Sequence, residues 1–234
     1  MAEPQPLADD LWLSAHDRPD GHSLLRDQSL AMGLATALLA ELIGAGLVTL
    51  HESRLYLNDP PPWRADDTLH EVLWVLYAEA PGTPVDDLLR YLAGADRARL
   101  LVEGTIDGDD YAPPRAVGER LIHRGRLSRR QPPLAVPGLR RKGLRKVWAH
   151  HPASLNDPAI PGMRIAATAR GRARLDPHHL MLAALFRLTG LSQPLSALGT
   201  DGTRWIDGQI PLLPAALRQL LHHTELLQSG SVKR

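Results

Sequence analysis

One run of the chain is apolar on almost every side. After Asp27, residues 28–45 carry only four polar interruptions, among them Thr36 and Glu41. A helix that is hydrophobic all round belongs in the middle of a bundle, so this pattern predicts a central helix. The overlapping window 30–50 is the best transmembrane candidate, but an ionised Glu41 would be costly inside a bilayer, which favours a buried core helix.

Amphipathic spacing and capping signals predict further helices. Residues 68–71 form a capping box, which predicts a helix start. Leu69, Val72, Leu73 and Leu76 have the spacing of one helical face. Helices are also predicted at residues 7–15, 84–92, 95–103, 114–124, 177–190 and 214–227. The polar stretch GTDGTRWIDG, residues 199–208, is predicted to be a loop.

Two predicted helices end in the same way, with leucine, three further residues, and then Gly46 or Gly125 before an apolar strand start. Glycine adopts the left-handed conformation that closes a helix. The sequence LVTLHESRLYL after Gly46 alternates around residues 51–53 and predicts a β-hairpin. A second hairpin is predicted over residues 129–146, with Pro and Gly at 131–133 and 137–138 shaping its turns.

These elements predict a mainly α fold, a compact helical-bundle domain around a buried central helix with one or two β-hairpins. A chain of 234 residues with 44% apolar composition can bury such a core. We expect one domain over residues 1–234, with its core at about 5–227 and short flexible ends. The chain has no cysteine, and its first ten residues lack the basic start of a signal peptide, so a cytoplasmic location is predicted.

The charge is unevenly distributed. Lys and Arg number 27 and Asp and Glu 26, but residues 120–146 hold ten basic and no acidic residues. The remainder of the chain then has seventeen basic and twenty-six acidic residues. Such segregation predicts a local surface that binds anions.

The centre of this basic segment reads RRQPPLAVPGLRRKGLRK, residues 129–146, with a short apolar tip from Leu134 to Val136. Arginine predominates, and its planar guanidinium matches phosphate oxygens in pairs. Three interpretations stay open from the residues alone. The segment binds anionic lipid, or it binds nucleic acid as part of a winged helix, or it pairs with the acidic remainder of the same or another molecule.

Little in the sequence indicates catalysis. The histidine pairs 150–151, 178–179 and 222–223 point in different directions on a helix and match no metal-binding motif, so they are interpreted as surface and helix-end residues. Acidic pairs at 9–10, 66–67, 86–87 and 109–110 lie mostly before helices, where they stabilise the helix dipole. We predict no catalytic residue, no metal and no cofactor.

Residues 21–50, GHSLLRDQSLAMGLATALLAELIGAGLVTL, resemble the Golgi phosphoprotein 3 family, whose bacterial relatives are common in actinobacteria. Glu41, Leu42 and Gly46 stand at its Glu-Leu pair and its glycine before a strand. Weaker similarity continues through ERLIHRGRL and into the helix that begins at Asp176, covering about residues 5–227. The resemblance implies a mainly helical, non-enzymatic peripheral membrane protein that binds phosphatidylinositol 4-phosphate and the cytosolic tails of membrane enzymes.

The resemblance also implies a basic phosphate pocket near a tryptophan, and a projecting hydrophobic hairpin that contacts a membrane or another subunit. Arg26 stands in place of the tryptophan, and Ala35 in place of an arginine of the central helix. The two other pocket arginines fall at Arg115 and Gly118, or in another register at Tyr111 and Pro114. Residues 129–146 fall at the projecting hairpin.

The combined prediction is a protein on the cytoplasmic face of a membrane that binds anionic phospholipid headgroups. The predicted contacts are Arg26, Arg115, Arg129, Arg130, Arg140, Arg141, Lys142, Arg145 and Lys146. Leu134 and Val136 are predicted to insert into the membrane or to join two copies. A protein cargo is a further predicted partner. The alternatives are a winged-helix nucleic-acid-binding protein and a soluble oligomeric adaptor without lipid binding.

Overall fold

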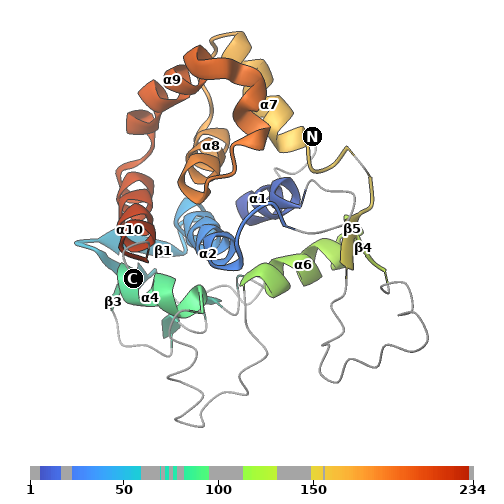
Figure 1. Cartoon of the computed structure of the whole chain (residues 1–234). Helices are drawn as coiled ribbons and strands as arrows, with labels where there is room; N and C mark the ends of the chain where they lie inside the picture. Colours follow the sequence, from blue (N-terminus) through green and yellow to red (C-terminus); the bar gives the residue numbers. More distant parts are fainter. Residues whose placement is uncertain are drawn as a thin grey trace.

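A single apolar helix runs through the middle of the protein, as predicted. This helix is α2 (Asp27–Gly44), and the computed structural model surrounds it with α1 (Leu7–Ala15), α4 (Val85–Leu92), α6 (Pro113–His123), α8 (Pro177–Thr189) and α10 (Ala215–Ser231) (Figure 1). Leu34, Leu38 and Leu42 of α2 are fully buried. The structure describes residues 6–16, 23–58, 69, 72, 73, 76, 77, 82–94, 113–130, 149–154 and 156–231.

The helices predicted along the chain are largely confirmed. Helix α1 has the predicted ends, and α8 and α10 occupy the two late helical runs. Val72, Leu73 and Leu76 are helical and buried, as their shared face predicts. Helix α4 begins at Val85, one residue later than predicted, because Pro84 belongs to a short strand, β3 (Thr83–Pro84). The helix predicted at 95–103, the capping residue Thr68 and the acidic pairs 66–67 and 109–110 lie outside the described residues.

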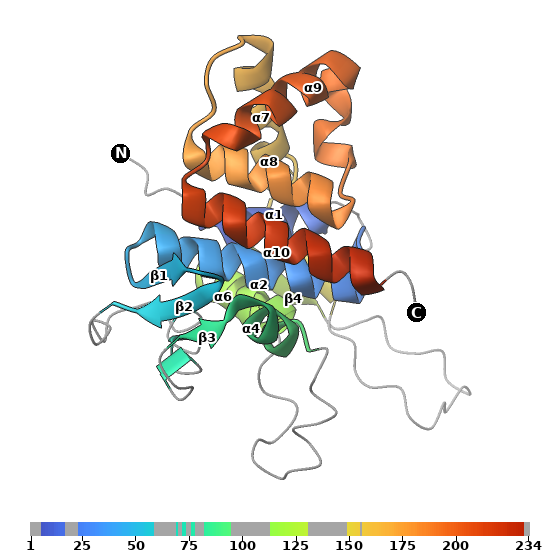
Figure 2. The same cartoon turned by 90° about the vertical axis from the view of Figure 1, so that its left-hand side faces the viewer.

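The loop prediction for residues 199–208 was wrong, because these residues form α9 (Gly199–Gln209). Helix α9 packs against α7 (Ile160–Arg170), α8 and the short helix η1 (Gln193–Leu198), and continues into η2 (Ile210–Leu212). Ile206 and Gln209 are buried by these contacts. Tertiary packing therefore stabilises a helix whose Gly, Thr and Asp residues favour other conformations. Figures 1 and 2 show α7 and α9 on the far side of α8 from α2; the sequence analysis also missed α7.

Two antiparallel sheets complete the fold. In the first, β1 (Val48–His51) pairs with β2 (Arg54–Leu57) around the two-residue turn at Glu52 and Ser53, and β2 also pairs with β3. In the second, β4 (Leu127–Arg130) pairs with β5 (Ala149–Pro152), with Arg130 opposite Ala149. The first predicted hairpin is therefore confirmed. Of the second, the structure confirms an antiparallel pair of strands, but β5 lies after the predicted range 129–146. Residues 131–148, which join β4 to β5, lie outside the described residues.

Both helix-to-strand junctions use the same closure. Gly46 and Gly125 have φ angles of 70° and 68°. The Gly46 N–H donates to the Ile43 carbonyl at 3.0 Å, and the Leu47 N–H donates to the Leu42 carbonyl at 3.0 Å. Gly125 and Arg126 make the equivalent bonds to Ile122 and Leu121, at 2.9 and 2.8 Å. This Schellman pattern satisfies the last carbonyls of each helix and confirms that the two junctions share one device.

Among the helices of the described part, none is both long enough and apolar enough to cross a bilayer.

Candidate anion-binding surface

The basic segment begins on α6, and a buried ion network fixes that helix against the core. The Arg120 side chain is only 3% exposed, and it lies between carboxylates from two other helices. Its Nε donates to Asp9 Oδ1 of α1 at 2.8 Å, and its Nη1 donates to Glu41 Oε2 of α2 at 3.3 Å. A buried cation needs such partners, because an unpaired charge in the interior is strongly destabilising.

Glu41 is the one acidic residue of α2 beyond its first turn, and its contacts explain its place in this apolar helix. Its Oε1 accepts a hydrogen bond from the Ala8 N–H at 2.7 Å, one of the amides that α1 leaves unpaired at its first turn. Burial raises the pKa of Glu41, although the Arg120 guanidinium and the Ala8 N–H oppose the rise. Glu41 therefore joins α1, α2 and α6 at one point.

The helix-dipole interpretation of the Asp9-Asp10 pair was incomplete. Both residues lie in the first turn of α1, as predicted, but both are also buried. Asp9 Oδ2 accepts a hydrogen bond from Arg124 Nη1 at 2.9 Å, in addition to the contacts with Arg120. Asp10 Oδ2 lies 3.2 Å from Nε2 of His178, a residue that the sequence analysis placed at the surface. These carboxylates hold helices together across the core.

The structure describes the side chains of three of the ten basic residues in the segment 120–146, and all three are paired with acidic residues from elsewhere in the chain. Arg120 and Arg124 bind Asp9, and Arg126 Nε donates to Asp157 Oδ2 at 3.0 Å. The interpretation as a face paired with the acidic remainder therefore holds for these three. The other seven basic residues all lie within residues 129–146.

Some of the predicted contact residues lie in the described part of the structure and others do not. Arg129 and Arg130 lie in β4, opposite His150 and Ala149 of β5. Arg115 lies in the first half of α6. Arg26 is exposed immediately before α2, at the opposite end of that helix from Glu41. The remaining predicted contacts lie outside the described residues: Leu134, Val136, Arg140, Arg141, Lys142, Arg145 and Lys146.

Comparison with models of known protein families matches residues 7–224 to Golgi phosphoprotein 3 (GPP34). The chain belongs to the Golgi phosphoprotein 3 family. The match extends from the first residue of α1 into α10, and it confirms the resemblance seen in residues 21–50. No curated protein compared with the chain matches it.

Within this Golgi phosphoprotein 3 chain, two positions of the family's phosphate pocket carry no charge. Ala35 on α2 is fully buried, and Gly118 on α6, the position in one of the two registers, is buried as well. Neither side chain offers a hydrogen-bond donor to a phosphate. In that register, Arg26 and Arg115 are the two basic residues that the resemblance predicts at the pocket.

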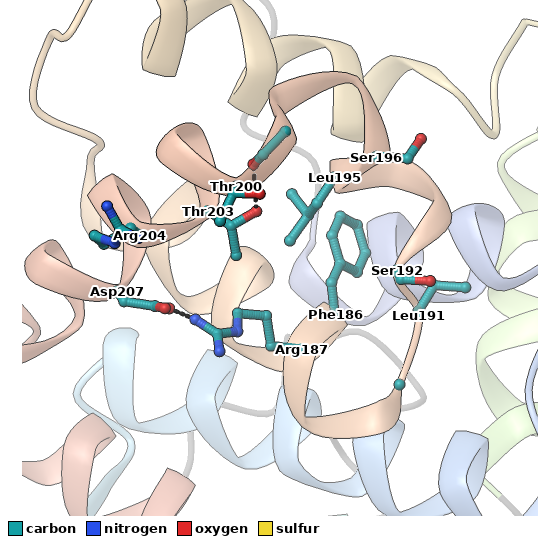
Figure 3. Close-up of a pocket in the computed structure, with 12 residues that line it drawn as sticks. Phe186, Arg187, Leu191, Ser192, Leu195, Ser196, Thr200, Thr203, Arg204 and Asp207 are labelled. Atoms are coloured by element: carbon teal, nitrogen blue, oxygen red, sulfur yellow. Dashed lines mark hydrogen bonds and ion pairs between the residues drawn. The ribbon is translucent and has the colours of Figure 1, made fainter.

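A hollow lies elsewhere, between α8, η1 and α9. It has a volume of about 720 Å³ and is lined by apolar residues such as Phe186, Leu191 and Leu195 (Figure 3). An ion pair between Arg187 and Asp207 separates it from a second hollow of about 560 Å³. Of the predicted contact residues whose side chains the structure describes, Arg26 lines neither hollow.

The sequence analysis also missed a polar cluster between Ser53, Asp86 and His223. Asp86 was interpreted as a helix-dipole residue, and the pair 222–223 as surface residues. The structure places the His223 ring between the Ser53 hydroxyl and the Asp86 carboxylate. No spacing in the sequence signals this cluster, because its members come from a turn and two distant helices.

Proposed function

We propose that the protein is a peripheral membrane protein that binds anionic phospholipid headgroups through the basic segment 129–146. The observation that carries this proposal is the concentration of seven basic residues, with no acidic residue, at the end of β4 and in the connection from β4 to β5. The three preceding arginines are compensated by Asp9 and Asp157, whereas no acidic residue occurs within the segment itself.

The charge is sufficient for reversible membrane association. Each basic residue near an anionic surface contributes about 1 kcal/mol. The apolar residues Leu134 and Val136 add a small hydrophobic contribution if they insert between headgroups. Arg129 and Arg130 are the last residues of β4, and β4 pairs with β5. This pairing holds the two ends of the connection between the strands close together.

Membership of the Golgi phosphoprotein 3 family supports lipid binding, since it is consistent with the lipid binding known in that family. By the same resemblance we propose phosphatidylinositol 4-phosphate as the headgroup, with Arg26 and Arg115 as additional contacts. The role proposed is that of an adaptor on the cytoplasmic face, acting as one domain, with a protein cargo or a second copy as partner. This role needs no cofactor and no chemical step.

Vesicle cosedimentation tests the proposal. The protein is mixed with vesicles of phosphatidylcholine alone, of phosphatidylcholine with phosphatidylglycerol, and of phosphatidylcholine with phosphatidylinositol 4-phosphate. We expect binding to the anionic vesicles only. Changing Arg140, Arg141 and Lys142 together to Ala should weaken binding about 100-fold, since three charges contribute roughly 3 kcal/mol.

A matched control removes the same charge from another surface. Arg164, Arg170 and Arg174 are exposed on and after α7. Their replacement by Ala should leave vesicle binding nearly unchanged. Equal binding to neutral and anionic vesicles, or equal losses in the two triple variants, would contradict the proposal.

The same samples distinguish the alternatives. A winged-helix protein would bind duplex DNA in a salt-sensitive manner and keep that binding when Leu134 and Val136 become Ser. A soluble oligomeric adaptor would bind neither vesicles nor DNA, and its mass in solution would increase with concentration.

A further inference from the structure

Three side chains from distant parts of the sequence meet beside the β1–β2 turn. The Ser53 hydroxyl lies 3.0 Å from Nε2 of His223, and Nδ1 of the same ring lies 2.7 Å from Asp86 Oδ1. Ser53 belongs to the turn, Asp86 to the first turn of α4, and His223 to α10. Helix α10 packs against both β1 and α4, which brings the three together (Figure 2).

The chemistry of the groups sets the direction of each hydrogen bond. The Asp86 carboxylate only accepts, so Nδ1 of His223 carries the hydrogen, and Nε2 of the neutral ring is left as the acceptor. The Ser53 hydroxyl therefore donates to Nε2. Gln219 Nε2 lies 3.3 Å from Ser53 Oγ and donates to it. In this arrangement a hydroxyl is bonded to a base, and a carboxylate orients that base, as activation of a serine nucleophile requires.

The type of turn between β1 and β2 does not favour a serine at position 53. Glu52 and Ser53 have φ angles of 47° and 62°, as a two-residue hairpin turn of this type requires at both positions. Asn and Gly are the residues that such a turn favours, so Glu and Ser are costly here. The Val85 N–H donates to the Ser53 carbonyl at 3.0 Å and fixes the serine backbone against α4. Strained residues held in this way are concentrated at functional sites.

The cluster is both held in position and accessible. The neighbour of His223 on α10, Thr224, is fully buried, and its hydroxyl lies 3.0 Å from that of Thr36 on the central helix. The His223 side chain is 13% exposed and that of Asp86 is 38% exposed, while Ser53 is half-buried. The cluster therefore borders solvent and does not lie in the interior of the core.

We propose that Ser53 is a nucleophile that accepts an acyl group from small esters, with His223 as its base. Ser53 Oγ attacks the carbonyl carbon while its proton moves to His223 Nε2. The bond from that carbon to the leaving oxygen then breaks, and the leaving oxygen takes the proton from His223. Water next attacks the acyl-serine, gives its proton to Nε2, and releases the acid as Ser53 Oγ regains its proton.

Two neighbours assist without forming a bond to the substrate. Asp86 is a positioning residue, since it holds the ring in the tautomer that leaves Nε2 free to accept a proton. The Gln219 amide donates to Ser53 Oγ at 3.3 Å, and so holds the hydroxyl oxygen in place beside His223. The activity is additional to lipid binding and does not depend on it.

Labelling and kinetics on the full chain test this proposal. A fluorophosphonate probe should form a covalent adduct with Ser53, located by mass spectrometry of the digested protein. Hydrolysis of p-nitrophenyl acetate should show a fast first turnover followed by a slower steady rate. Ser53→Ala and His223→Gln should each lower kcat/KM about 100-fold or more.

Three exposed residues of the same types serve as control positions for substitution. Two of them are neighbours of His223 and Asp86, and the third is a serine on another surface. His222 is exposed beside His223, Asp87 is exposed beside Asp86, and Ser196 is an exposed serine of η1. His222→Gln, Asp87→Asn and Ser196→Ala should keep the labelling and the rate of hydrolysis. Asp86→Asn should lower kcat about tenfold or more with KM unchanged and with little change in melting temperature.

Each outcome decides the question. A fluorophosphonate adduct on Ser53 together with loss of hydrolysis in Ser53→Ala supports the proposal. An unlabelled Ser53 in the wild-type chain overturns it, and this result does not require that any variant folds. A fall in hydrolysis that is equal in His223→Gln and His222→Gln also overturns it, since the reaction would then come from exposed imidazole in general.

Discussion

The units α2–Gly46–β1–β2 and α6–Gly125–β4–β5 share the same backbone closure at a glycine. They differ in how the helix is held and in how the strands are connected. Each helix closes on a glycine with a positive φ angle and the same pair of backbone hydrogen bonds. Each then continues into an antiparallel pair of strands. The helices differ: apolar neighbours bury most of α2, whereas α6 combines the buried Val117 and Leu121 with the buried ion pairs of Arg120.

The connections differ as well. The first hairpin turns in two residues, Glu52 and Ser53, which determine the register of β1 and β2. In the second, residues 131–148 join Arg130 to its partner Ala149. The residues around each glycine thus specify where the helix ends and the first strand begins. The length and sequence of the connection between the strands are set by other residues. The predictions below test whether the two units depend on different forces.

The largest expected effect concerns the anchor of the second unit. Arg120→Ala removes the cation that Glu41 binds and one of the two that Asp9 binds, and should cost about 3–5 kcal/mol of unfolding free energy. Urea denaturation measures this loss. Arg124→Ala is the control, because that side chain also binds Asp9 but is 41% exposed, and should cost at most about 1 kcal/mol. Similar losses in the two variants would show that burial of the pair is unimportant.

A second change makes the two hairpins alike. Replacing residues 131–148 by Asn-Gly joins Arg130 to Ala149 by a two-residue turn, as in the first hairpin. The shorter loop should stabilise the fold by about 2 kcal/mol, because less chain entropy is lost on closing it. The variant should also lose binding to anionic vesicles. Lower stability would indicate that the removed segment packs on the domain, and retained vesicle binding would exclude it as the contact.

The shared glycine closures should respond equally. Gly46→Ala and Gly125→Ala should each cost about 1–2 kcal/mol, since an added Cβ meets no neighbour and only the left-handed backbone is strained. Gly44→Ala is the control. Its position is open and lies within α2, so the change should stabilise the protein by about 0.5 kcal/mol. Chemical denaturation of the three variants measures these differences, and a much larger cost at one junction would break the equivalence.

The smallest expected effect is a pH dependence of the unfolding free energy, which arises from Glu41 at the contact between the two units. Burial raises the pKa of Glu41, so the folded state binds more protons at this site than the unfolded state does above pH 4.5. The stability of the wild type relative to Glu41→Gln should therefore be greatest below pH 4.5 and decrease as the pH rises through the folded pKa. Denaturation curves at several pH values measure the difference. A difference that grows with pH would mean that the Arg120 cation outweighs the burial of Glu41.

Much of the fold could be predicted from short stretches. The central helix follows from an apolar run, the first hairpin from alternation around residues 51–53, and both glycine closures from a single residue each. Helix α9 could not be predicted, because its residues favour turns, and only the packing of Ile206 against neighbouring helices makes it helical. For the candidate site, the charge segregation was visible, but the pairing of Arg120, Arg124 and Arg126 was not.

The sequence by itself determined the central helix, the two helix-to-hairpin junctions and the concentration of positive charge in residues 120–146. Only the tertiary structure decided which of those charges are neutralised and which hydroxyl meets a base. The reason is physical. Backbone preferences act over a few residues, whereas hydrogen bonds of about 3 Å join Arg120 to Asp9 and His223 to Ser53, over 111 and 170 positions of the chain. Such contacts form only where the packing of the whole core brings distant helices together.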